Sequence, residues 1–229
     1  MNEKIVGVVI ALKLEGLNIE KKLGSFTKKV TIGDFDFYFF RNKKTVFVLV
    51  YSGVGELSAS IATTLLISNF KASLILNFGL CGSLSPLYKL GDVVLCNEVV
   101  HYDFHPDTSD PAREAVYLSR SSPVFNVSFP SFLKHISSYP FVRIASGDKF
   151  IALSDMKEHL YSKFNCSVCD MESAGINLSC SRLGVECIFV KAVSDNADES
   201  AQTSFEDSIK NGVSAYENLI TYIAEKLNE

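Results

Sequence analysis

Carboxylates stand near the ends of several apolar runs in this chain. Glu15 comes after the first apolar run, and Asp195 comes two residues after the last. Asp170 and Glu172 flank a methionine where apolar residues resume. Carboxylates can donate or accept protons when a pocket adjusts their pKa, which suits them to acid–base catalysis. A structural alternative holds for Asp170 and Glu172, because the helix dipole favours acidic residues in a first turn.

Two glycine pairs also follow apolar runs. They are Gly53 with Gly55 and Gly79 with Gly82. Glycine lets the backbone approach a ligand closely, but neither pair follows the dinucleotide or P-loop pattern. Tight turns are therefore the alternative interpretation of both pairs.

Short apolar runs rich in β-branched residues are typical of strands that are buried on both faces. We expect such strands at 5–12, 45–51, 73–78, 92–100, 141–145 and 186–193. Apolar residues at helical spacing predict helices over 56–70 and 173–183. Strands that alternate with helices indicate a mainly parallel sheet, and ligands bind at the carboxyl ends of its strands. The polar residues described above stand at those ends.

Other segments complete the expected fold. The runs 35–40 and 45–50 predict an antiparallel hairpin, which makes the sheet mixed. Apolar residues at helical spacing from Ser204 to the end predict a long closing helix with Ser204 as its N-cap. Residues 101–140 hold five of the six prolines and predict an irregular surface segment that could cover a substrate. The expected fold class is α/β, a single-domain three-layer sandwich over 1–229 with a central mixed β-sheet flanked by helices.

Composition narrows the class of protein. At 229 residues and 47% hydrophobic, the chain can bury a substantial core. A net charge of −4 gives no long-range attraction to nucleic acid, so a small-molecule partner is favoured. The apolar run 5–12 is flanked by Glu3 and Lys13, and no run of about 18 apolar residues occurs, which argues against a signal peptide and a membrane span. We therefore expect a cytoplasmic protein that binds neither nucleic acid nor membrane.

Cysteine and histidine placement gives little support for a metal. The six cysteines are scattered through apolar segments, which suggests buried reduced thiols. Cys166 and Cys169 have the C-x-x-C spacing, but a strong zinc signal needs four ligands. The four histidines are dispersed and are interpreted as ordinary packed or solvated residues; they are His101, His105, His135 and His159. We expect no metal and no organic cofactor.

Seven motifs give the chain a family resemblance. They are Ile10-Ala-Leu-Lys-Leu-Glu15, Ser52-Gly-Val-Gly55, Asn77-Phe-Gly-Leu-Cys-Gly82, Lys89-Leu-Gly-Asp92, Ser146-Gly-Asp-Lys-Phe-Ile151, Asp170-Met-Glu-Ser-Ala174 and Ala192-Val-Ser-Asp-Asn-Ala-Asp198. With these motifs in this order, the chain resembles the 5′-methylthioadenosine/S-adenosylhomocysteine nucleosidases of the purine nucleoside phosphorylase superfamily. The motifs cover nearly the whole chain and are more specific together than any one alone.

The resemblance implies catalytic roles for three carboxylates. Asp195 would be the general acid that protonates N7 of the purine, and Ser194 would orient it. Glu15 would position and deprotonate the attacking water. Glu172 would hold the ribose hydroxyls.

The resemblance also implies substrate contacts and a partner. Phe150 would stack on the purine, the backbone of Ile151 would hydrogen-bond its edge, and Met171 would pack against the sugar. Further expected substrate contacts are Val54, Leu80 and Phe205. The family pattern implies a homodimer in which a neighbouring subunit helps close the pocket for the 5′ substituent, and it requires no cofactor.

Some positions depart from the family pattern. Leu80 and Cys81 stand where small residues are common, Leu12 stands where a methionine often lines the sugar pocket, and Lys191 replaces a frequent arginine. The segment 104–117 does not align clearly with the family. The motifs therefore indicate the chemistry more sharply than the substrate.

Three alternatives to this activity stay open. Phosphorolysis would use phosphate in place of water, but phosphate subsites recruit arginine, and Glu15 stands where it would repel an anion. Hydrolysis suits the carboxylates because glycosidic cleavage passes through an oxocarbenium-like state that needs an acid and an anionic surrounding. The other two are a nucleosidase for a different purine nucleoside and a catalytically silent nucleoside-binding domain.

Overall fold

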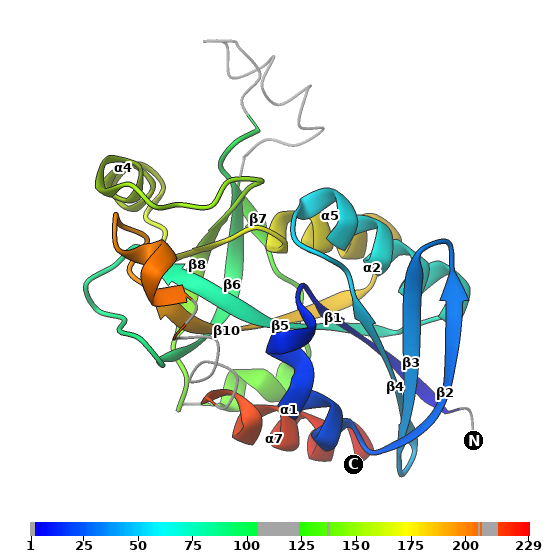
Figure 1. The fold of residues 1–229 in the computed structure, drawn as a ribbon. Coiled ribbons are helices and arrows are strands. Elements are labelled where there is room, and N and C mark those ends of the chain that lie inside the picture. Colours follow the sequence, from blue (N-terminus) through cyan, green and yellow to red (C-terminus); the bar gives the residue numbers. More distant parts are fainter. Residues whose placement is uncertain (1–2, 105–123, 137, 206, 208–214) are drawn as a thin grey trace.

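The fold is known from a computed structural model that describes residues 3–104, 124–136, 138–205, 207 and 215–229 (Figure 1). The strands are β1 (Lys4–Ile10), β2 (Ser25–Ile32), β3 (Phe35–Asn42), β4 (Thr45–Tyr51), β5 (Leu74–Ser83), β6 (Val93–His101), β7 (Val124–Asn126), β8 (Phe141–Ser146), β9 (Val168–Asp170) and β10 (Glu186–Asp195). The helices are α1 (Lys13–Leu23), α2 (Glu56–Phe70), α4 (Ser154–Phe164), α5 (Ser173–Leu183), α7 (Glu217–Asn228) and the 3₁₀ helix η1 (Ser131–His135).

The strands form one mixed sheet in the order β10-β6-β8-β9-β5-β1-β4-β3-β2, with β7 on β6. β10 also pairs with β5, so β5, β10, β6, β8 and β9 close into a ring. β1, β4, β5 and β10 run parallel to their neighbours in the centre, whereas β3 and β4 form the predicted antiparallel hairpin. One side of the sheet is therefore closed into a ring, and the other side, which continues through β1, β4, β3 and β2, is open.

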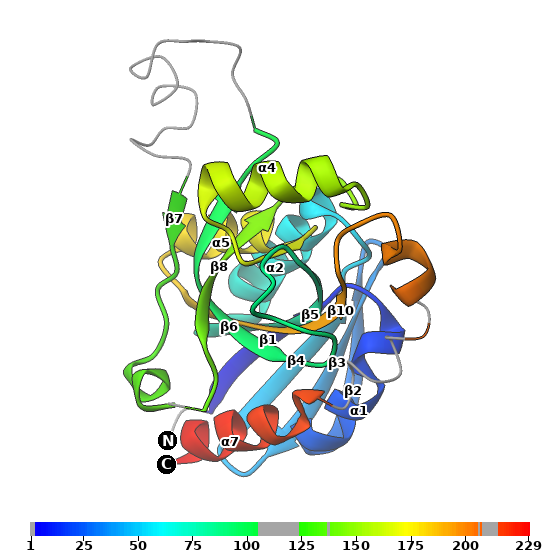
Figure 2. The same cartoon turned by 90° about the vertical axis from the view of Figure 1, so that its left-hand side faces the viewer.

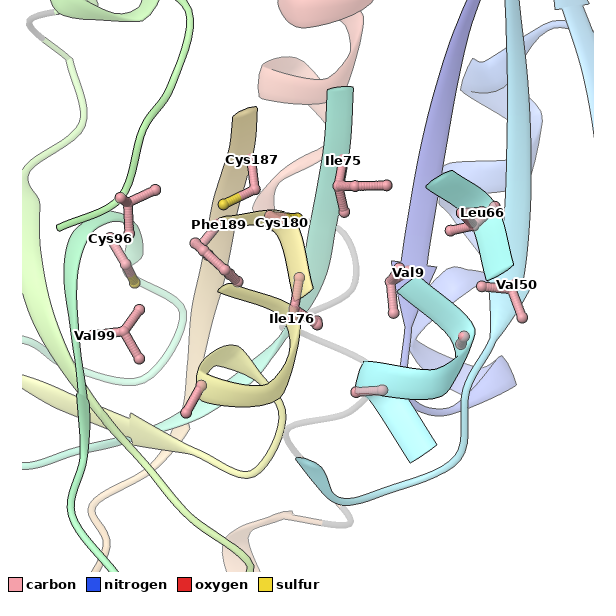
Figure 3. Close-up of a cluster of buried hydrophobic side chains, with 14 of the residues drawn as sticks. Val9, Val50, Leu66, Ile75, Cys96, Val99, Ile176, Cys180, Cys187 and Phe189 are labelled. Carbon is pink, nitrogen blue, oxygen red and sulfur yellow. The ribbon is translucent and has the colours of Figure 1, made fainter. Parts of the chain in front are cut away.

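Helices cover the sheet on both faces. α2 and α5 lie on one face, and α1 and α7 lie on the other (Figures 1 and 2). Figure 3 shows the apolar cluster on the first face, where Leu66 of α2 and Ile176 of α5 meet Val9, Ile75 and Phe189 of the strands. A second cluster joins α1 and α7 to the opposite face. The predicted fold class, a mixed sheet between two helical layers, is confirmed.

The predicted strands are present with shifted bounds. The first strand ends at Ile10, so Glu15 lies in the first turn of α1 and does not directly follow the strand. β5 runs on to Ser83 through both Gly79 and Gly82, which are therefore strand residues and not turns. Continuous pairing of β5 with β10 explains this extension.

The closing helix does not begin as predicted. Residues 201–205 are already helical, and the Ser204 hydroxyl donates to the Ser200 carbonyl, so Ser204 is not an N-cap. The last helix begins at Glu217, after Tyr216 in a turn with φ −99° and ψ 9°. Helical spacing alone did not reveal this turn.

The proline-rich segment is described only in part. Residues 105–123 lie outside the described residues, and so does the prediction that they cover a substrate. β7 and η1 give the later part of the segment short regular structure. In the described part of the chain, no helix is long and apolar enough to cross a membrane.

Candidate active site

A cavity of about 520 Å³ opens where the carboxyl ends of β5, β9 and β10 meet. Its size and its mainly apolar wall suit a small-molecule ligand. The wall contains every side chain predicted to act in catalysis or substrate binding: Glu15, Val54, Leu80, Phe150, Ile151, Met171, Glu172, Ser194, Asp195 and Phe205. The other lining residues are Ala11, Leu12, Cys81, Gly82, Lys149, Cys169, Asp170 and Gln202.

Asp195 is aimed into the cavity by an irregularity at the end of β10. The parallel register with β5 shifts just before Asp195 pairs with Gly82, and such bulges commonly redirect side chains beside active sites. Asp195 Oδ1 accepts the Ala197 backbone N–H at 2.8 Å, and Oδ2 lies 2.7 Å from the Ser194 hydroxyl oxygen. Burial raises the pKa of Asp195 against these hydrogen bonds. The carboxyl is therefore able to hold a proton closer to neutral pH.

Gly82 makes this placement of Asp195 possible. A Cβ at position 82 would lie 3.0 Å from Asp195 Oδ1 and equally close to the side chains of Ala197 and Cys169. The glycine motif noticed in the sequence thus gives space to the carboxylate.

Glu172 directly precedes α5 and is buried, but its side chain makes no capping hydrogen bond to the helix. Its Oε1 accepts the backbone N–H of Gly55 at 3.1 Å. Gly55 has φ +104°, a backbone conformation that favours glycine, which explains why this loop needs one there. Burial and the nearby Asp170 raise the pKa of Glu172 to about 8, with Lys191 opposing the shift.

Glu15 is fixed by backbone donors from two directions. Its Oε2 accepts the N–H of Leu12 at 2.8 Å, and its Oε1 accepts the N–H of Leu80 at 3.0 Å. Burial raises the pKa of Glu15, while these two hydrogen bonds and the charge of Lys191 counter the rise. The Tyr216 hydroxyl donates to the Glu15 backbone carbonyl at 3.1 Å, which connects the turn before α7 to α1.

A buried ion pair lies behind the carboxylates. Lys191 is fully buried, and its Nζ lies 2.7 Å from Asp170 Oδ2. Burial alone would lower the pKa of Lys191, but Asp170 and Glu172 raise it above the ordinary lysine value. A Cβ at Gly79 would lie 3.5 Å from Lys191 Nζ and 3.6 Å from Glu15 Oε1. The lysine charge is therefore close to the carboxylates of the cavity wall.

Lys191 is not among the site residues that the sequence predicts. The available signal was its position, because Lys191 is the single charged residue inside the apolar run Cys187–Val193. A lysine in a buried strand needs a partner, since an isolated buried charge is strongly unfavourable. The partner, Asp170, lies on β9 and could not be identified from spacing.

An aromatic pair forms the outer wall of the cavity. The rings of Phe150 and Phe205 meet edge to face with centroids 6.0 Å apart and an interplanar angle of 79°. Phe150 and Val54 are about half exposed, whereas Ile151 and Leu80 are buried deeper in the wall. Exposed aromatic surface at the mouth suits a planar, partly apolar ligand.

Comparison with known proteins agrees with this geometry. The model of the phosphorylase superfamily matches residues 5–225. The chain belongs to the phosphorylase superfamily. Within it, the chain is 26% identical over 228 residues to the aminodeoxyfutalosine nucleosidase of Campylobacter jejuni, covering 97% of this chain and 99% of that protein.

Nucleosidases named for another substrate match at similar identity. The 5′-methylthioadenosine/S-adenosylhomocysteine nucleosidase of Staphylococcus epidermidis is 26% identical over 232 residues, covering 97% of this chain and 100% of that protein. The structure of such a nucleosidase from Helicobacter pylori with butyl-thio-DADMe-Immucillin-A has a TM-score of 0.87 at 23% identity and covers 99% and 100% of the two chains. The predicted resemblance to nucleosidases is confirmed, and with it the expectation of an enzyme.

Proposed function

We propose that this protein hydrolyses the N-glycosidic bond of 5′-methylthioadenosine, of S-adenosylhomocysteine, or of both, and releases adenine. One observation carries the proposal. Three buried carboxylates from three different elements, Glu15, Glu172 and Asp195, line a single cavity of nucleoside size. Cleavage of this bond needs an acid at the base and negative charge around the sugar.

The proposed reaction moves two protons. Asp195, protonated before cleavage, gives its proton to N7 of the purine as the bond between the base and the sugar breaks with its electrons going to the base. Water then forms a bond to the anomeric carbon and loses a proton to Glu15. The positive charge that develops on the sugar favours the ionised form of Glu172, which accepts hydrogen bonds from the ribose hydroxyls.

The charges around the cavity support water as the nucleophile. Among the lining residues that the structure describes, Lys149 is the one cation, and no arginine lines the wall. The charge of Lys191 is already paired with Asp170. A phosphate ion would therefore meet Glu15 without a planar cationic partner, which is unfavourable.

A second substrate class has equal support from the relatives. The Campylobacter jejuni protein is named as an aminodeoxyfutalosine nucleosidase and is as similar to this chain as the Staphylococcus epidermidis protein. Aminodeoxyfutalosine is thus the second candidate substrate, with the same bond and the same carboxylates.

Base release measured by chromatography tests the proposal. The substrates are 5′-methylthioadenosine, S-adenosylhomocysteine, aminodeoxyfutalosine, 5′-deoxyadenosine, adenosine and inosine, each with and without phosphate. We expect adenine release from the first two at rates that phosphate does not change. Strict dependence on phosphate would overturn hydrolysis, and release from aminodeoxyfutalosine alone would overturn the substrate assignment. Tight nucleoside binding without base release would indicate a silent binding domain.

We also propose that residues 1–229 form one nucleosidase-like domain that acts as a cytoplasmic homodimer. Leu57 and Ile61 of α2 are exposed apolar residues close to Val54 in sequence, and they support a subunit contact beside the cavity. All six cysteines are free and buried, which suits a reducing compartment. Light scattering of the purified chain tests the dimer.

A further inference from the structure

Three side chains gather at the end of β6, next to the start of α2. His101 Nε2 lies 2.8 Å from Glu56 Oε2 and 3.1 Å from Asp103 Oδ1. One potential ligand atom from each residue lies within 4.8 Å of the other two. None of these residues lines the nucleosidase cavity.

The Asp103 carboxylate is held in place by a backbone donor, and Asp148 connects it to the start of α2. Asp103 Oδ2 accepts the Asp148 N–H at 2.7 Å, which leaves Oδ1 directed at His101. Asp148 Oδ1 accepts the Glu56 N–H at 2.8 Å and so fixes the first turn of α2. The cluster is thus built by three segments of the chain and not by one flexible loop.

Two polar atoms of the cluster lack a complete set of hydrogen-bond partners. His101 Nε2 carries at most one hydrogen, yet it faces two carboxylate oxygens at hydrogen-bonding distance. Glu56 Oε1 is buried and has no hydrogen-bond partner of good geometry among the described residues, although the nearby Ser146 hydroxyl lowers the pKa of Glu56. A buried carboxylate oxygen without a partner is unfavourable, and a cation can satisfy it.

We propose that Glu56, His101 and Asp103 bind a divalent transition-metal ion of the zinc class. Imidazole nitrogen and carboxylate oxygen are both zinc ligands at about 2.0–2.2 Å, so neighbouring ligands in a tetrahedral site lie about 3.4 Å apart. The His101–Glu56 and His101–Asp103 distances would each have to widen by about 0.3–0.6 Å to reach this spacing. The side chains of His101 and Asp103 are 23% and 27% exposed, against 8% for Glu56, so the ion has access from solvent and room for a water ligand.

Such an ion supports the active site without taking part in the reaction. Glu56 directly follows Gly55, whose N–H holds Glu172, and Asp148 lies two residues before Phe150 in the cavity wall. A metal bridging α2 and β6 therefore fixes two loops that shape the sugar and purine sides of the cavity. Spacing alone predicts an ordinary His101, because its partner Glu56 is far away in the sequence.

Zinc binding to the chelator-treated full-length chain tests the proposal. Calorimetric titration with Zn²⁺ and thermal unfolding with and without Zn²⁺ are compared for the wild type, His101→Ala, Asp103→Asn and the control His159→Ala on α4. We expect the wild type and the control to bind one Zn²⁺ per chain and to unfold at a higher temperature with it. His101→Ala and Asp103→Asn should bind at least about tenfold more weakly and lose the shift.

The following results would contradict the proposed zinc site. Wild type without stoichiometric Zn²⁺ binding overturns it, as does binding that His101→Ala and Asp103→Asn leave unchanged. Mg²⁺ binding of equal strength overturns the zinc class, because Mg²⁺ selects oxygen ligands and does not need the imidazole. Circular dichroism of each metal-free variant checks folding, and Asp103→Asn decides the matter if His101→Ala does not fold.

Discussion

Asp195 combines a raised pKa with two fixed oxygens, and this combination sets the consequence of replacing it. Asparagine has the same shape but has no acidic proton for the purine. We expect Asp195→Asn to lower kcat by about 10²–10⁴-fold, the usual contribution of a general acid, with a smaller change in KM. Steady-state base release measures both constants.

Asp198 supplies the matched control. It is a partly exposed carboxylate three residues further on, and it accepts hydrogen bonds from Ser200 outside the cavity. Asp198→Asn should keep kcat within a factor of about two, a change well below that of a lost general acid. Equal activity of the Asp195→Asn and Asp198→Asn variants would remove Asp195 from the acid role.

The Lys191–Asp170 pair has a stability consequence. Lys191→Met leaves the Asp170 charge buried without its cation, so we expect the free energy of unfolding to fall by about 3–5 kcal/mol. Adding Asp170→Asn removes the stranded charge and should recover part of this loss. Urea unfolding of the wild type, the two single variants and the double variant measures the coupling. Strictly additive losses would mean that the pair is not coupled.

At the scale of elements, α2 and α5 approach each other at a glycine. A Cβ at Gly175 would lie 2.3 Å from the Glu56 carbonyl oxygen, so the helices cannot keep this distance with a larger residue. Gly175→Ala should lower the free energy of unfolding by about 1–3 kcal/mol through overpacking. It should also raise KM, because Glu172 precedes α5 and Gly55 precedes α2.

The control for this substitution lies on the same helix. Ser181 of α5 is exposed, and Ser181→Ala should change the free energy of unfolding by less than about 0.5 kcal/mol. Urea unfolding and steady-state kinetics of both variants give the comparison. A Gly175→Ala variant as stable and active as wild type would show that the two helices can move apart freely.

Local patterns predicted most of the central elements. The runs that became β1, β4, β5 and β10 are apolar because both faces of these strands are covered, and α2 carries helical spacing. The ring was not predictable, since β5–β9 and β10–β6 pair residues far apart in the sequence. The turn at Tyr216 was also hidden, because apolar spacing continues across it.

The residues of the candidate active site were predictable where the family resemblance covers them. The family resemblance predicted residues of the cavity wall, with Phe150 inside a motif and Phe205 outside the motifs. They could not supply partners that depend on tertiary contacts, such as Asp170 for Lys191 or Glu56 for His101. Which charged residues pair across strands depends on the fold, and it cannot be predicted from the spacing of residues in a single sequence.

At the scale of the whole molecule, the buried carboxylates make stability depend on pH. Glu172, with its pKa raised to about 8 by burial and by Asp170, binds a proton in the folded state at pH values where the unfolded state has lost it. The free energy of unfolding should therefore fall as pH rises from about 5 to 8, by up to about 1.4 kcal/mol per pH unit for this group. The raised pKa values of Glu15 and Asp195 act in the same direction.

Glu172→Gln tests this dependence. The amide resembles the protonated acid and does not ionise, so the variant should show a flatter decline and gain stability over wild type near pH 8. Urea unfolding across this pH range measures it. Glu158→Gln, at an exposed position on α4, should keep the wild-type slope, and an unchanged slope for Glu172→Gln would contradict the raised pKa.

The closed ring of strands also limits when the sheet can complete its folding during synthesis. β5 and β6 are made early, but they are joined through β10, which ends at Asp195. A nascent chain emerges from its N-terminus and folds in units, so the early strands must wait for this late one. The proposed acid, Asp195, and the last strand of the ring are therefore synthesised together. We expect an incompletely synthesised chain to have neither a finished sheet nor nucleosidase activity.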